Sequence, residues 1–394
     1  MSASFYEFYC PVKIISGHKA LEHIPFELGV LQSRRPMIIT DAGVIGAGLL
    51  AYVEQALQGA GIEVGALFKD VPPDSSMDTV RKAADLYRSS GCDSLIAVGG
   101  GSVIDTSKGV NILVSEGSDD LHAFAGAHNL KKPLKPLFVV PTTSGTGSEV
   151  TMVAVISDTE KQVKVPFTSY FLLPNAAVLD PRMTTTLPAH LTAMTGMDAM
   201  THAVESYTCL ASNPISEVYA FNAVRKISEN LLHVMDHPQD AEGRLQLAEA
   251  STMAGIAFSN AMVGLVHSLG HSLGAVAHLP HGLCMNLFLP YVLEYNLPMI
   301  GPRLGALLLP LAGSDIYAAT PESSRPNRSI AQIRTLRDQI YQRSKLPRTL
   351  SETAKVKKNQ LQQIAEMAVN DGSILFNPRE ADVADLLALL HEAW

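Results

Sequence analysis

The first half of the chain alternates short apolar runs, rich in β-branched residues, with longer segments of helical spacing. Strands are expected at Phe5–Tyr9, Lys13–Ile15, Met37–Thr40, Val64–Phe68, Ser94–Val98 and Phe138–Val140. The helical segments among them are Ala47–Gly59, Thr79–Ser89 and Val103–Val114. Strands that alternate with helices in this way indicate βαβ units and a parallel sheet.

From about Pro188 the pattern changes to long segments with helical periodicity and few β-branched runs. These segments are Ala189–Cys209, Ile215–Val234, Arg244–Phe258, Ser329–Ser344 and Ala381–Trp394. The sequence therefore predicts an α/β domain built on a parallel sheet in residues 1–185, followed by an all-α domain in residues 186–394.

The composition fits two globular domains, since 47% of the 394 residues are hydrophobic and 17% are charged. The formal net charge is −8, without a block of like charges, so neither nucleic acid nor an anionic membrane is an expected partner. The first residues resemble no secretory signal, and the most apolar short run is too brief to cross a bilayer. The four cysteines form no CxxC pair, which favours a reducing compartment. We therefore expect a cytoplasmic protein.

A glycine cluster follows the predicted strand Ser94–Val98 and precedes the helical segment Val103–Val114. It consists of Gly99, Gly100, Gly101 and Ser102. At such a strand-to-helix turn, backbone N–H groups can approach an anion closely, and the helix dipole favours negative charge. The spacing is not the GxGxxG of ordinary Rossmann folds, and a plain tight turn is the alternative to phosphate binding.

A second loop, rich in glycine and hydroxyl side chains, follows the predicted strand Phe138–Val140. It runs from Pro141 to Glu149 and includes Thr142, Thr143 and Thr146. Its O–H and N–H groups can donate hydrogen bonds to phosphate oxygens. Two such loops at strand ends of one sheet fit a dinucleotide that crosses the carboxyl edge of the strands.

Asp41 directly follows the predicted strand Met37–Thr40. A carboxylate at this place can accept hydrogen bonds from a ribose diol, and it would repel a 2′-phosphate, which favours NAD over NADP. The alternative is an aspartate that caps a helix or a turn.

Asp198 and His202 lie four residues apart in a helical segment, so both side chains lie on one helix face. Five of the thirteen histidines fall at positions 202, 267, 271, 278 and 281, among apolar residues. An apolar setting tolerates so many imidazoles only when each has a partner, and a metal ion can be that partner. The alternative is a set of packing histidines bonded to carbonyl oxygens, with Asp198 in an ion pair.

With these motifs, the sequence resembles the iron-containing (group III) alcohol dehydrogenase family. The resemblance runs from the N-terminal strands to the C-terminus and includes several separate motifs in the family's order. These are Gly99–Lys108, Pro141–Thr151, Asp180–Glu205, Gly264–Gly282 and Asn377–Arg379. It implies a dehydroquinate synthase-like architecture, with an N-terminal dinucleotide-binding domain and a C-terminal helical domain that binds metal and is catalytic. Members of this family commonly dimerise through their N-terminal strands, so we expect a homodimer or a larger homo-oligomer.

The resemblance also implies site residues. The metal ligands would be Asp198, His202, His267 and His281, holding Fe²⁺, with Zn²⁺ as an alternative. His271 would lie beside the metal and relay protons, Phe258 would shape the substrate pocket, and His278 is left without a role. NAD contacts would come from Asp41, Gly99, Gly100, Gly101, Ser102, Thr142, Thr143, Thr146, Thr151 and Lys164. One departure is Pro72-Pro73-Asp74, where many relatives carry Pro-Asn-Pro.

These residues make chemical sense as a dehydrogenase for a primary or short-chain alcohol or aldehyde and NAD(H). A divalent ion held by three neutral imidazoles and one carboxylate keeps a net charge near +1 and favours loss of the alcohol proton. One alternative is a related lyase of the dehydroquinate-synthase type, which would need a phosphate-binding cluster of Lys and Arg beside the histidines. Another is a cofactor-sensing protein without turnover, which would have no use for a Lewis acid.

Overall fold

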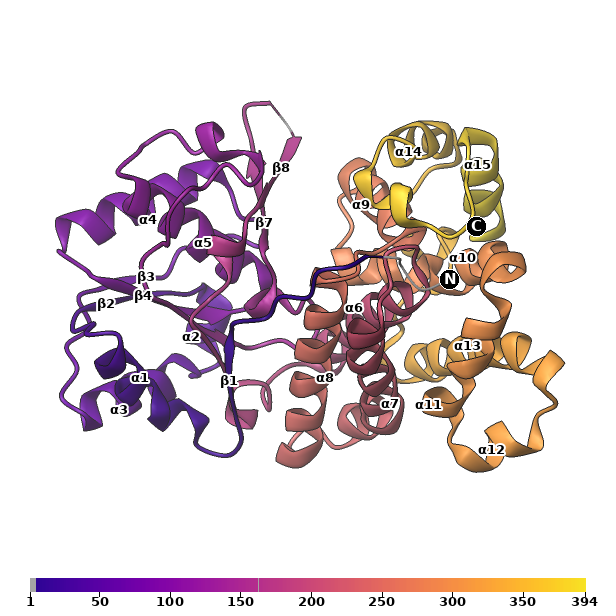
Figure 1. The fold of residues 1–394 in the computed structure, drawn as a ribbon, viewed down its shortest axis with the longest axis horizontal. Coiled ribbons are helices and arrows are strands. Elements are labelled where there is room, and N and C mark those ends of the chain that lie inside the picture. The colour runs from indigo at the N-terminus through magenta and orange to yellow at the C-terminus, as the bar shows by residue number, and fades with distance from the viewer. Residues whose placement is uncertain (1–4, 162) are drawn as a thin grey trace. The chain divides into compact units, whose positions relative to one another are not determined.

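The computed structural model describes residues 5–161 and 163–394, and their helices and strands are labelled in Figure 1. The chain divides into two compact units, each described by itself below. One comprises Cys10–Leu187, and the other comprises Pro188–Trp394 together with residues 5–9. Among the helices in these ranges, none has both the length and the apolar content that crossing a membrane requires.

The Cys10–Leu187 unit is built on a six-stranded sheet in the order β1-β9-β6-β4-β2-β3, with every neighbouring pair parallel. The strands are β1 (Lys13–Ser16), β2 (Pro36–Ile39), β3 (Ala66–Phe68), β4 (Ser94–Gly99), β6 (Leu137–Pro141) and β9 (Ala176–Leu179). Strands β2, β4, β6 and β9 are buried along their whole length, which explains why they are continuous apolar runs. The predicted parallel sheet is confirmed.

Helices cover both faces of this sheet (Figure 1). They are α1 (Ile24–Val30), α2 (Ala42–Gly46), α3 (Leu50–Gly59), α4 (Met77–Ser89) and α5 (Gly101–Glu116). Because side chains alternate along a strand, Met37 and Ile39 pack in one core with α4 and α5, whereas Ile38 packs in a second core with α1 and α3. A smaller sheet, in the order β5-β8-β7, consists of β5 (Gly126–Ala127), β7 (Val153–Asp158) and β8 (Val163–Thr168).

The second unit is helical throughout its regular structure in the described residues. Its helices are α6 (Ala189–Thr208), α7 (Pro214–Asp236), α8 (Ala241–Ser259), α9 (Leu265–Ala277), α10 (His281–Ala306), α11 (Leu308–Ala312), α12 (Ser314–Ala319), α13 (Arg325–Ser344), α14 (Leu361–Ala368) and α15 (Val383–Glu392). Helix α6 is buried on nearly all sides, and its apolar residues share one core with α7, α8, α9 and α10. The predicted all-helical second half is confirmed.

One predicted strand is wrong. Residues 5–9 form no strand but an extended arm, in which Tyr9 N–H donates to Asn260 Oδ1 at 2.7 Å and Phe8 stacks on Tyr219. The aromatic residues of this arm have high strand propensity, yet their backbone meets no neighbouring strand within the described chain.

Candidate active site

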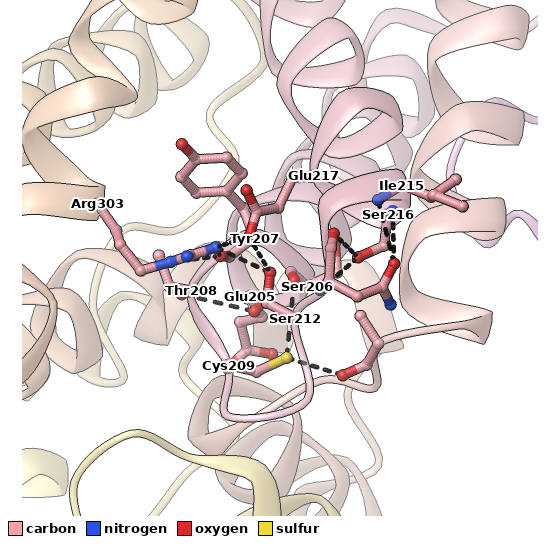
Figure 2. Close-up of polar contacts among 12 residues, drawn as sticks. Glu205, Ser206, Tyr207, Thr208, Cys209, Ser212, Ile215, Ser216, Glu217 and Arg303 are labelled. Atoms are coloured by element: carbon pink, nitrogen blue, oxygen red, sulfur yellow. Dashed lines mark hydrogen bonds and ion pairs between the residues drawn. The ribbon is translucent and has the colours of Figure 1, made fainter. Parts of the chain in front are cut away.

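Helix α6 brings Asp198 and His202 onto one face, as their spacing predicts. Its C-terminal end is fixed by Arg303 of α10, which donates from Nε to the Tyr207 carbonyl oxygen at 2.9 Å and forms an ion pair with Glu217 at 2.7 Å (Figure 2). Arg303 also stacks over the Tyr207 ring. The helix that carries two of the site residues is thereby held at both its buried face and its end.

Four side chains from three helices converge within this unit. One ligand atom from each of Asp198, His202, His267 and His281 lies within 4.8 Å of all the others. The first three residues are buried, and His281 is half-buried, with Nε2 3.2 Å from Asp198 Oδ1. Helix α10 comes very close to α6 here, because a Cβ on Gly282 would lie only 2.6 Å from the Met194 carbonyl oxygen. This contact sets where His281, the first residue of α10, enters the cluster.

The donor atoms of this cluster fit a divalent cation. Asp198 Oδ1 and His267 Nε2 are both buried, and neither has a hydrogen-bond partner of good geometry among the described residues. Burial alone would raise the pKa of Asp198, but the charges of His202 and His281 lower it, so the side chain is a carboxylate. Burial lowers the pKa of His267 well below its usual value, and the neighbouring His281 and His271 add to this. Three imidazoles and one carboxylate, without thiolate, form a ligand set for iron or zinc.

His271 and Phe258 border the cluster. His271 is stacked against His281 with ring centres 5.4 Å apart, and its Nδ1 lies 2.9 Å from Asp371 Oδ2. The His271 side chain is 44% exposed, so it links the cluster with solvent. Phe258 stacks on His202 at a centroid distance of 4.3 Å. His278 ends α9 with a left-handed backbone, at a φ of 51°.

In the other unit, the predicted cofactor residues follow three adjacent strands. Asp41 follows β2, Gly100 follows β4, and Thr142 follows β6. These strands are neighbours and parallel, so their carboxyl ends share one edge of the sheet. Asp41 caps α2 by accepting from Val44 N–H at 2.9 Å, which is the structural role that the sequence left open for it. The cap uses Oδ1 of Asp41, so Oδ2 is the oxygen that can accept a hydrogen bond from a ribose hydroxyl.

The two loops rich in glycine and hydroxyl groups pack against each other. A Cβ on Gly100 would lie 3.2 Å from Thr143 Oγ1, and a Cβ on Gly101 would lie 2.9 Å from Thr146 Cγ2. Glycine is therefore needed where the loop after β6 touches the start of α5. The Ser102 hydroxyl donates to the Pro73 carbonyl oxygen. This hydrogen bond joins the segment Pro72-Pro73-Asp74, which differs from the Pro-Asn-Pro of many relatives, to the same turn.

Thr151 and Lys164 lie further from this turn along the chain. Thr151 is buried, and its hydroxyl lies 3.1 Å from Nζ of Lys108. Lys164, on β8, is exposed and pairs with Asp74 at 3.3 Å. Two buried ionisable residues were missed by the sequence reasoning: Lys108 and Glu205. Both fall inside the motifs Gly99–Lys108 and Asp180–Glu205, and this position in a motif is the only signal that the sequence offers for them.

Comparison with known proteins covers almost the whole chain. Residues 11–181 match the model of the family described as iron-containing alcohol dehydrogenase. Residues 192–394 match the model described as the C-terminal part of the Fe-containing alcohol dehydrogenase family.

Individual relatives agree with these matches. The chain is 32% identical to the NAD-dependent methanol dehydrogenase of Bacillus methanolicus, over 98% of this chain and 99% of the relative. It is 34% identical to the 1,3-propanediol dehydrogenase of Klebsiella pneumoniae, with 100% of both chains covered. A crystal structure of 1,3-propanediol oxidoreductase superposes with a TM-score of 0.94, at 33% identity, over 99% of this chain and 100% of that one. The lyase and sensor alternatives gain no support from these relatives.

Proposed function

The chain belongs to the iron-containing alcohol dehydrogenase family and is an NAD-dependent oxidoreductase of alcohols or aldehydes. From this we propose which residues carry out the reaction and which class of substrate they act on. The substrate is a primary or short-chain alcohol or its aldehyde. The relatives act, by their names, on methanol and 1,3-propanediol, which supports small unbranched substrates.

The metal is held by Asp198, His202, His267 and His281, and Fe²⁺ is its resident ion. The observation that carries this proposal is the convergence of four ligand atoms within 4.8 Å, two of which are buried and have no hydrogen-bond partner of good geometry in the part of the chain that the structure describes. Such atoms are costly to bury unless a ligand satisfies them. A divalent ion, when bound there, lowers the pKa of a substrate hydroxyl and so prepares the alcohol for loss of hydride.

The remaining steps fall to side chains around the cluster. His271, hydrogen-bonded to Asp371 and partly exposed, passes the alcohol proton to solvent. Phe258, stacked on His202, presents an apolar surface next to the cluster and limits the size of the substrate. NAD, when bound, would supply the acceptor for the hydride.

NAD is held along the sheet edge of the Cys10–Leu187 unit. Asp41 accepts hydrogen bonds from the adenosine ribose, and the loop of Gly99, Gly100, Gly101 and Ser102 receives the pyrophosphate at the start of α5. Thr142, Thr143 and Thr146 add hydroxyl donors, and Lys164 adds a positive charge. Thr151 contributes through the loop's conformation, since its side chain is buried against Lys108.

The test is a panel of alcohols and aldehydes with NAD(H), run anaerobically with added ferrous ion. We expect turnover of short primary alcohols, with methanol and 1,3-propanediol among those tested, and lower activity on secondary or branched ones. Absence of any alcohol-dependent reduction of NAD by the iron-loaded protein would refute the proposal.

We also propose a homodimer, or a multiple of one, in the cytoplasm. All four cysteines are free, as a reducing compartment favours. The arm at the N-terminus exposes Phe5 to 78% and Tyr9 to 48%, which suits a contact with a second copy. Light scattering of the purified protein measures the oligomer directly, and a monomer would contradict the proposal.

A further inference from the structure

Glu205 is a buried carboxylate that the proposed reaction does not use. It lies on α6, seven residues after Asp198, and its side chain is 5% exposed. Its Oε1 accepts the Val266 N–H at 2.7 Å, and its Oε2 lies 2.5 Å from Nδ1 of His267. Both partners belong to the first turn of α9, so a single side chain joins α6 to the start of that helix.

The start of α9 is shaped to receive this carboxylate. Helix α9 begins after Gly264, which has no capping side chain of its own. A Cβ on Gly264 would lie 3.2 Å from Glu205 Oε1 and 3.2 Å from Asn377 Oδ1, so a larger residue would push the carboxylate away. The positive end of the helix dipole and the free N–H groups favour an anion there.

An ionised Glu205 next to Nδ1 favours the tautomer of His267 that carries its proton on that nitrogen. A neutral imidazole has one N–H donor and one acceptor nitrogen. When Nδ1 donates to Glu205, the lone pair is left on Nε2, which is buried and has no hydrogen-bond partner among the described residues. This Nε2 belongs to the cluster that includes Asp198.

We propose that Glu205 is a positioning residue of the metal centre: it holds His267 in the orientation and tautomer in which Nε2 can bind a divalent cation. The inference rests on the proposed function, which makes His267 a ligand. Carboxylates that hold a ligating histidine in this way typically contribute 10- to 100-fold in metal affinity.

Glu205→Gln tests the proposal with little change of volume. If the amide oxygen of the glutamine still accepts the Val266 N–H, its NH₂ group lies next to Nδ1 of His267. An NH₂ group can only donate, so Nδ1 must accept, and the ring proton moves to Nε2. We expect the Kd of ferrous ion, measured anaerobically against a chromophoric chelator, to rise by roughly 10- to 100-fold. The same rise is expected for Zn²⁺, because the effect acts on the ligand and not on the metal.

Asp371→Asn is the matched control. It makes the same carboxylate-to-amide change next to Nδ1 of His271, a histidine that lies on α9 as His267 does. Its Kd for the metal should equal that of the wild type. His267→Ala separates the two proposals. If it leaves the Kd unchanged, the metal centre itself is wrong; if it abolishes binding while Glu205→Gln binds normally, only the role of Glu205 is overturned.

If Glu205→Gln does not fold, the proposal can still be tested on the unmodified protein. In the zinc-loaded protein with ¹⁵N-labelled histidine, the His267 signals should show a protonated Nδ1 and a metal-shifted Nε2. An unprotonated Nδ1, or a metal-shifted Nδ1, would overturn the assignment of Glu205.

Discussion

Nζ of Lys108 lies 2.8 Å from the carbonyl oxygen of Thr151, across 43 residues of chain. The same ammonium group donates to the carbonyl oxygens of Ser148 at 2.9 Å and of Val153 at 2.8 Å. Lys108 is fully buried in α5. Three carbonyl oxygens around one nitrogen call for all three N–H donors of an ammonium group, so the charge of Lys108 holds the end of the loop after β6 against the helix that starts at the glycine cluster.

Lys108→Met should therefore destabilise the protein and weaken its hold on NAD. The methionine keeps most of the volume but takes the ammonium donor away from all three buried carbonyl oxygens. The carbonyl oxygen of Ser148 keeps the Thr151 N–H at 3.4 Å and that of Val153 keeps the Thr151 hydroxyl at 3.4 Å, while an acceptor left unpaired costs about 1–3 kcal/mol. We expect the free energy of unfolding in urea to fall by about 3 kcal/mol. The KM for NAD should rise roughly tenfold, equivalent to about 1.4 kcal/mol, while kcat at saturating NAD changes less.

Lys82→Met is the control, because Lys82 is exposed on α4 and the substitution is the same. Its free energy of unfolding should stay within about 0.5 kcal/mol of the wild type. A Lys108→Met protein with wild-type stability and wild-type KM for NAD would contradict the role given to Lys108.

The stability contributed at Lys108 should depend on pH. Burial lowers the pKa of Lys108 from 10.5 to about 8, against the opposing charges of Asp105 and Glu149. The unfolded chain then binds more protons than the folded one between about pH 8 and 10.5, so stability rises with pH in that window. The difference in unfolding free energy between wild type and Lys108→Met should therefore grow from pH 8 to pH 10. A constant difference would mean that the lysine stays fully charged in both states.

Asp41 is expected to set the preference for NAD over NADP. The substitution Asp41→Asn keeps the cap on Val44 N–H, since asparagine caps helices about as well as aspartate, and removes only the charge. We expect the ratio of kcat/KM for NAD to that for NADP to fall by roughly tenfold or more, with unchanged thermal stability. Asp41→Gly should narrow the preference as well. Equal use of NADP and NAD by the unmodified enzyme would show that Asp41 does not have this role.

The fold follows from local patterns that the sequence displays openly. Strands that are buried on both faces are continuous apolar runs, so the order of apolar residues along the chain is enough to predict β2, β4 and β6. Helix α10 is absent from the elements that the sequence predicts, and it contains Pro290, Pro298 and Pro302, a residue type that usually interrupts helices. Its first two turns are held by core packing that no local pattern reveals.

The candidate site is predictable only in part, because local sequence patterns do not show which helices pack against each other. The spacing of Asp198 and His202 places them on one helix face, but nothing local places His267 and His281 beside them; the family resemblance supplied that. Glu205 and Lys108 look in sequence like ordinary surface charges. Their burial depends on which helix ends pack against them, and this is decided by tertiary structure.

His271→Ala should retain the metal and slow alcohol oxidation. The residue is stacked on His281 and bonded to Asp371, but none of its atoms belongs to the four-ligand cluster. We expect kcat to fall by roughly 100-fold, which is the lower range for loss of a group that transfers protons. The loss should be largest at low pH, where hydroxide that could take the alcohol proton is scarce. Metal analysis accompanies the kinetics, and loss of metal would make His271 a ligand in place of one of the four.

Alanine at Asp198, His202, His267 or His281 should remove most of the metal and nearly all turnover, while NAD still binds. Metal content and quenching of NADH fluorescence measure the two separately. One oxygen and three nitrogens accept ferrous iron or zinc, and the general affinity series favours zinc, so the assignment of iron depends on the family and on metal supply. Ferrous enzyme should lose activity in air or peroxide, whereas zinc enzyme should be largely indifferent. Chelation should abolish activity, and anaerobic re-addition of Fe²⁺ should restore it; full activity in the stripped protein would contradict metal-assisted oxidation and favour a metal-free reductase.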